Sequence, residues 1–196
     1  MTDTAPLVSI ARPSHHVPVR LDSAWVAKRI ATRSCCVLAT TSGDGPHTAA
    51  VLYVAVGTNM YVNTLRSSRK ARNIARNPNV SVCIPIRRLP IGPPATVQFA
   101  AQATLLAPDD PEIAACLAAG VLKRITSHGE IALDGSCFVR ITPTARINTY
   151  GLGMPLRRLI ADPLHTSGST DVSPFPVPFP SLLLPGSTLT SMKLPA

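Results

Sequence analysis

The sequence predicts a mainly β protein with accessory helices, in which six to seven strands form an antiparallel barrel. Short segments rich in apolar and β-branched residues follow one another closely, and the turn at residues 42–45 contains the Asp-Gly pair that is typical of hairpins. After a first helix, the elements run strand, strand, strand, helix, strand, strand, helix, strand, strand. Because helices do not alternate regularly with strands, this order favours an antiparallel barrel over a doubly wound parallel sheet.

The chain divides into three parts by composition. Its 196 residues are enough for one domain with a substantial core. Residues 1–21 contain three prolines and predict an irregular N-terminal arm. Residues 22–162 are assigned to the barrel domain. Residues 163–196 are rich in Pro, Ser and Thr and almost uncharged, which predicts a disordered tail because this composition cannot build a core.

The elements of the barrel domain follow in chain order. The first helix, over residues 22–32, buries Trp25 and Ile30. Strands are predicted at residues 35–41, 46–56, 60–64, 79–86, 95–106, 135–143 and 145–151. The second helix ends before Pro78 and has an apolar stripe formed by Ala71, Ile74 and Ala75. A third helix spans residues 108–125, with acidic residues near its start and basic residues near its end, as the helix dipole favours.

The positive charge of the chain is large and unevenly placed. The net charge is +9, and residues 45–108 contain seven Lys or Arg but no Asp or Glu. Such a field attracts anions, whether nucleic acid, anionic lipid or a phosphorylated small molecule. The alternative is a solvated basic face that maintains solubility. Nucleic acid is the weaker of the specific interpretations, because single-strand binding also needs aromatic stacking platforms and aromatic residues make up only 4% of the chain.

Several other classes of function find little support. The five cysteines include no C-x-x-C spacing and are interpreted as reduced, mostly buried thiols. The histidines lack partners at zinc-like spacing, so we expect no metal. No G-x-S-x-G, G-x-G-x-x-G or Walker motif is present. There is no apolar run of membrane-spanning length and no signal-peptide-like apolar region, from which we expect a cytoplasmic protein.

The start of the second helix carries charge of the wrong sign. The first turn of a helix favours anions, yet Arg69 and Lys70 stand there. Ser67 or Ser68 can cap this helix, and Thr64 ends the preceding strand. A bound anion would reverse the electrostatic cost, and backbone N–H groups, hydroxyls and fixed cations are the usual components of a phosphate site. The sequence therefore predicts a phosphate site at this helix start.

Four segments in this order resemble a known family: VLATTSGDGPHTAAVLY, MYVNTLRSSRKARNIARNPNVSV, VQFAAQATLL and FVRITPTARI. They resemble the split β-barrel oxidoreductases that use flavin or deazaflavin and are related to pyridoxamine 5′-phosphate oxidase. The resemblance covers residues 25–160 and implies an FMN-binding split barrel and a homodimer with cofactors at its interface. It also implies cofactor-binding residues, with Thr64, Ser68, Arg69 and Lys70 contacting the phosphate and Asn73 supporting the loop. Residues 47–53 would lie beside the cofactor ring.

The resemblance also limits which substrate and which cofactor we expect. No Lys or Arg lies between Arg33 and Arg66, whereas oxidases of pyridoxamine phosphate carry basic residues there, so vitamin B6 oxidation is disfavoured. The segment NTYGLGMPLRRL resembles the ending of actinobacterial deazaflavin-dependent members, which favours coenzyme F420 over FMN. We expect an F420- or FMN-dependent oxidoreductase that transfers a hydride between its cofactor and a small conjugated substrate, with no catalytic acid or base identified. The alternatives are a non-catalytic carrier of the cofactor and, with less support, a basic nucleic-acid-binding barrel.

Overall fold

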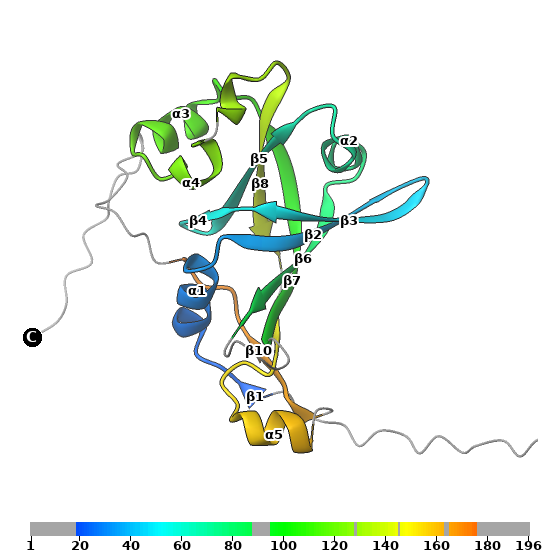
Figure 1. Ribbon diagram of the computed structural model, residues 1–196, viewed down its shortest axis with the longest axis vertical. Helices are drawn as coiled ribbons and strands as arrows, with labels where there is room; N and C mark the ends of the chain where they lie inside the picture. The colour runs from blue at the N-terminus through cyan, green and yellow to red at the C-terminus, as the bar shows by residue number, and fades with distance from the viewer. Residues whose placement is uncertain (1–18, 88–94, 128, 145, 163–164, 176–196) are drawn as a thin grey trace, which may run out of the picture.

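A single curled β-sheet forms the body of the molecule in the computed structural model (Figure 1), which describes residues 19–87, 95–127, 129–144, 146–162 and 165–175. Its ten strands are β1 (Val19–Arg20), β2 (Cys35–Ser42), β3 (Gly45–Leu52), β4 (Val54–Val56), β5 (Asn59–Leu65), β6 (Asn79–Ile86), β7 (Ala95–Leu106), β8 (Ser136–Pro143), β9 (Ile147–Tyr150) and β10 (Ser167–Thr170). Every pairing is antiparallel except that of β1 with β10. The expected antiparallel, mainly β architecture is confirmed.

The long strand β7 joins the two branches of the sheet. Its residues 95–102 pair with β6, which continues through β2 to β3 at the edge. On its other side, residues 96–98 pair with β9 and residues 101–106 with β8, which leads to β5 and β4. Because β7 belongs to both branches, the sheet curls around a core. Among the described strands, β3 pairs only with β2 and is a free edge of the sheet.

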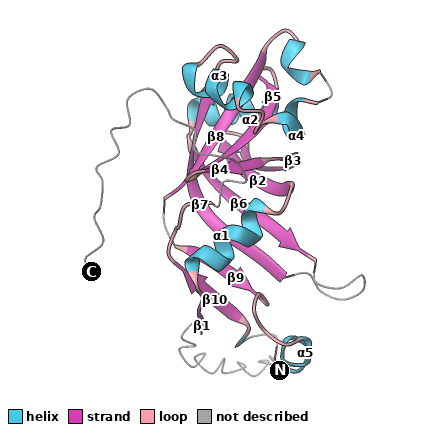
Figure 2. Cartoon of the chain, turned by 90° about the vertical axis from the view of Figure 1, so that its left-hand side faces the viewer, coloured by secondary structure: helices cyan, strands magenta, loops and turns pink. Residues whose placement is uncertain are grey.

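The helices cover the two ends and one opening of the curled sheet. They are α1 (Ser23–Ala31), α2 (Arg69–Arg76), α3 (Pro111–Ala118), α4 (Lys123–Thr126), α5 (Leu156–Ala161) and the 3-10 helix η1 (Glu130–Ala132). In Figure 2, α2, α3 and α4 lie at one end of the sheet, α5 lies at the other, and α1 crosses between them. The Tyr53 hydroxyl donates to the Ile30 carbonyl at 2.6 Å, which ties α1 to the barrel.

Two of the predicted elements are interrupted. The strand expected at residues 46–56 is divided at Tyr53, whose N–H still donates to the Ser34 carbonyl at 2.8 Å in the register of β2 and β3, while the following residues of β4 pair with β5. The helix expected at residues 108–125 is split into α3 and α4, because Gly120 adopts a φ of +68° that a continuous helix does not allow. The helix α5 was not expected from the sequence.

The boundaries of the barrel also differ from the prediction. Strand β1 lies within the segment expected to be irregular, and β10 lies within the expected disordered tail. Phe175 is 2% exposed and forms a bridge with Gly57. The expectation of disorder is therefore wrong for these positions, because the chain returns to complete the sheet. The rest of the arm and of the tail, residues 1–18 and 176–196, lies outside the described residues.

Other expectations can be compared with the side-chain positions. Ile30 is fully buried, whereas Trp25 is only half-buried. All five cysteines are free thiols; three are buried, Cys83 is half-buried and Cys35 is exposed. None of the helices in the described parts of the chain is long and apolar enough to cross a membrane.

Candidate functional site

The turn between β5 and α2 is held by hydroxyl hydrogen bonds. Ser68 is the N-cap of α2, and its Oγ accepts a hydrogen bond from the Ala71 N–H at 3.3 Å. The Thr64 hydroxyl, near the end of β5, donates to the same Oγ at 3.2 Å. Of the two candidate caps in the sequence, Ser68 fills the role. Thr64 and Ser68 therefore meet at the helix start, as the phosphate-site hypothesis requires.

Backbone hydrogen bonds fix the position of this turn. The Ser68 N–H donates to the Leu65 carbonyl at 3.0 Å, and the Arg66 N–H donates to the Gly135 carbonyl at 2.8 Å. The Arg72 guanidinium also donates to the Ser67 carbonyl. The turn is thereby tied both to the loop before β8 and to its own helix, which gives the first N–H groups of α2 a defined direction.

Two cations occupy the first turn of α2, and no acidic residue accompanies them there. Arg69 is exposed and Lys70 is half-buried. An eight-residue helix presents its unpaired N–H groups and its positive dipole end at this place, so the cations add to a potential that is already positive. A bound anion would be stabilised by both contributions.

Lys70 lines a small cavity between α2 and the sheet. The cavity has a volume of about 210 Å³. Its lining residues come from β3, β5, α2, α4 and η1: Ala50, Val51, Leu52, Asn63, Lys70, Ile125 and Glu130. Four of these residues are apolar, while Lys70 and the Asn63 amide supply polar groups and Glu130 adds a negative charge. The cavity combines a cation near a helix N-terminus with an apolar strand surface.

Asn73 lies on the buried face of α2. It is 3% exposed, and its Nδ2 donates to the Thr40 hydroxyl on β2 at 3.0 Å. The predicted stripe placed Ala71, Ile74 and Ala75 on this face, but Ala75 is exposed. Asn73 therefore joins α2 to the barrel from behind the turn, and its amide hydrogen bond is directed to β2.

The edge strand β3 presents a partly apolar face beside the cavity. Pro46, Thr48, Ala50 and Leu52 alternate outward and are exposed, with Leu52 49% exposed. Among the described strands β3 pairs only with β2, so its outer backbone groups have no strand partner there. An open edge of this length is a surface that proteins usually cover.

Cys137 is the buried thiol closest to this turn in the strand register, where it lies opposite Thr64. Burial raises the pKa of the Cys137 thiol, and the positive charges of Arg66 and Lys70 only partly oppose this shift. The group is therefore a neutral thiol at physiological pH, not a thiolate nucleophile. Its contribution to the site is packing.

The comparison with protein families is decisive for this chain. A family model described as pyridoxamine 5′-phosphate oxidase matches residues 24–149, which is more than half of the sequence. The chain belongs to this family. The match includes β2 to β8 and all of the turn between β5 and α2. No curated protein is a significant match.

Solved structures share the fold of this pyridoxamine 5′-phosphate oxidase family member. A heme binding protein from Mycobacterium smegmatis is 24% identical with a TM-score of 0.59, covering 78% of this chain and 59% of that one. The conserved hypothetical protein Rv2991 from Mycobacterium tuberculosis is 22% identical with a TM-score of 0.52, covering 68% and 86%. A FAD-binding protein from Mesorhizobium loti is 16% identical with a TM-score of 0.51, covering 63% and 88%. The fold is the split β-barrel.

Four of the five predicted site residues lie together at the turn, whereas the fifth lies behind it and joins α2 to the barrel. Thr64, Ser68, Arg69 and Lys70 gather at the turn, and Asn73 lies behind it. The sequence did not indicate that Asn63, Ile125 and Glu130 line the same cavity. They come from segments far apart in the chain, and no local motif marks them.

Proposed function

We propose that the chain binds a phosphorylated flavin-type cofactor, coenzyme F420 or FMN, with a phosphate at the start of α2. The main support for this proposal is the structure of the helix start. Ser68 caps α2, the Thr64 hydroxyl hydrogen-bonds to the Ser68 hydroxyl, and Lys70 lines the adjoining cavity. The donors suit an anion because N–H groups, hydroxyls and cations can all approach phosphate oxygens. Arg69 is assigned to the same phosphate, and Asn73 to supporting the turn.

The cavity in one chain is too small for such a cofactor, which supports a homodimeric site. About 210 Å³ is below the roughly 300–1,000 Å³ of ordinary ligand pockets. The open edge β3 borders this cavity and carries the exposed Leu52. A second copy placed over this edge would cover the strand and supply the missing walls. We therefore assign the remaining contacts of the cofactor to a partner subunit.

The proposed activity is hydride transfer between the cofactor and a small conjugated substrate. The bound cofactor supplies the hydride chemistry. The chain would hold the phosphate at α2 and present the β3 surface near Ala50 and Leu52 to the ring. Cys137 is buried and neutral, so we assign it no acid–base role. The basic field of the chain favours the more anionic of the two cofactors, coenzyme F420.

A cofactor carrier without turnover is the second candidate. It is supported by the fold shared with a heme binding protein and a FAD-binding protein, whose names refer to binding. The site residues described here hold and position a ligand, and such a set serves storage as well as catalysis. A basic nucleic-acid module has less support, because Trp25 is the only tryptophan and the Arg29 guanidinium of the same helix lies over its ring.

Titration with coenzyme F420, FMN and a single-stranded oligonucleotide at two salt concentrations separates these functions. The proposal predicts saturable binding of one cofactor and its turnover with a quinone or enone acceptor. Saturable binding without turnover of any acceptor would favour the carrier. Binding of the oligonucleotide alone, weakening steeply with salt, would contradict both cofactor functions.

A further inference from the structure

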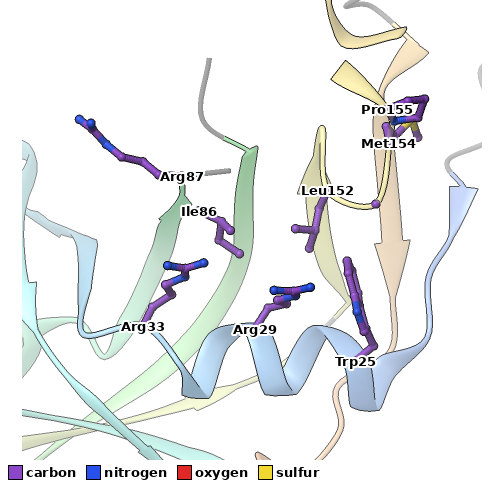
Figure 3. A pocket seen from close by; sticks show the side chains of 9 residues that line it. Trp25, Arg29, Arg33, Ile86, Arg87, Leu152, Met154 and Pro155 are labelled. Atoms are coloured by element: carbon purple, nitrogen blue, oxygen red, sulfur yellow. The ribbon is translucent and has the colours of Figure 1, made fainter. Parts of the chain in front are cut away.

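A second cavity lies against α1 and shares no lining residue with the Lys70 cavity among the described residues. Its volume is about 680 Å³, within the range of small-molecule pockets. Figure 3 shows it between α1, the end of β6 and the turn that follows β9. Ile86 and Leu152 form an apolar wall opposite the helix.

Arginines dominate the polar lining of this cavity. Arg29, in the last turn of α1, and Arg33, just beyond its end, extend from the helix side toward Ile86 and Leu152 (Figure 3). Arg87 stands at the rim with its guanidinium turned outward. Neither Asp nor Glu occurs among the lining residues that the structure describes. In the described part of the chain, none of these three arginines forms an ion pair with an acidic residue. Arginine stays protonated in proteins, so the cavity is positive at every physiological pH.

Ordinary structural roles explain only part of this arrangement. A cation in the last turn of α1 is favoured by the helix dipole, and the Arg29 guanidinium lies 4.9 Å from the centre of the Trp25 ring. These contacts do not explain Arg33. Its Nε is buried and has no hydrogen-bond partner among the described residues. A buried donor without an acceptor is costly, and a small rotation of the guanidinium toward an anion in the cavity would give this donor one.

We propose that this cavity binds a small organic oligoanion, a molecule with two or more carboxylate or phosphate groups on an apolar body. The guanidinium groups of Arg29 and Arg33 would take the anionic groups, since their planar forks match carboxylate and phosphate oxygens. Ile86 and Leu152 would contact the apolar part. This site is independent of the proposed phosphate site at α2 and does not rest on it.

The position of Trp25 provides a direct test. It lines the cavity and is the only tryptophan of the chain, so its fluorescence reports on this site alone. The probe is benzene-1,3,5-tricarboxylate, with citrate as a probe of the same carboxylate number without a ring. We expect saturable binding of the aromatic probe at one molecule per chain. Citrate is expected to bind several-fold more weakly, and equal affinity would contradict the role given to Ile86 and Leu152.

Matched variants test whether the probe binds through Arg29 and Arg33 themselves or through the overall positive charge of the chain. Arg29→Gln, on an exposed residue, and Arg33→Gln should each weaken binding by about tenfold or more, the loss for a charge-assisted hydrogen bond. Arg76→Gln removes the same charge from the exposed last turn of α2 and should change the affinity by no more than about twofold. Lys70→Ala should leave it unchanged. Calorimetry gives each affinity and melting curves verify folding; no binding, or equal weakening by Arg29→Gln and Arg76→Gln, would overturn the proposal.

Discussion

The Asn73 amide is the polar link between α2 and the barrel. It donates to the Thr40 hydroxyl at 3.0 Å, and both side chains are at most 3% exposed. Asn73→Ala should therefore lower the free energy of unfolding by roughly 1–3 kcal/mol, because the buried Thr40 hydroxyl loses its donor and keeps only its long bond to the His47 carbonyl. The double variant with Thr40→Val should cost less than the sum of the two single variants. Denaturant unfolding of the four proteins measures this coupling, and strict additivity would contradict the link.

The local structure of the turn that we propose as a phosphate site could be predicted from sequence because its residues are close together in the chain. Thr64, Ser68, Arg69 and Lys70 lie within one turn, so strand end, cap and helix start follow from short-range rules. Asn73 could not be placed in the same way. A polar residue beside an apolar stripe ordinarily faces solvent, and its partner Thr40 belongs to a strand thirty-three positions away in sequence.

At the scale of elements, β10 is the clearest addition to the expected barrel. Its residues are small and polar, so their composition indicated disorder. Their backbone groups nevertheless form hydrogen bonds with β9, and backbone pairing does not depend on the hydropathy of the side chains. The long helix that splits at Gly120 is a different case. Its apolar pattern continues through the break, and only the backbone conformation of glycine marks the turn.

Phe175 tests whether the segment after β10 belongs to the core. It is 2% exposed, whereas nearby Val172 is 37% exposed. Phe175→Ala should lower the free energy of unfolding by about 3–5 kcal/mol because it empties a packed position. Val172→Ala, the matched control, should change it by less than about 0.5 kcal/mol. Chemical unfolding would show the contrast, and equal small effects would mean that the barrel is complete without this segment.

At the scale of the whole molecule, the open edge β3 is where a second copy would attach. Leu52→Glu places a charge on this edge and should convert a dimer to a monomer, since burying an unpaired carboxylate costs more than such an interface can offset. Ile160→Glu is the control, because Ile160 is 68% exposed on α5 at the other end of the sheet. Solution mass by light scattering decides between them. A monomeric native protein, or a dimer broken by Ile160→Glu instead, would contradict the assigned interface.

Calorimetric titration of the Lys70→Ala variant measures whether a cofactor phosphate binds at the start of α2. Arg72→Ala is a poor control because Arg72 hydrogen-bonds to the Ser67 carbonyl in the same turn, so the control is Arg76→Ala. Lys70→Ala should weaken binding of the preferred cofactor by roughly 1–3 kcal/mol and leave the unliganded protein as stable as before or slightly more so. Arg76→Ala should alter the affinity little. Unchanged affinity in the Arg69→Ala, Lys70→Ala double variant would contradict a phosphate site at this helix start.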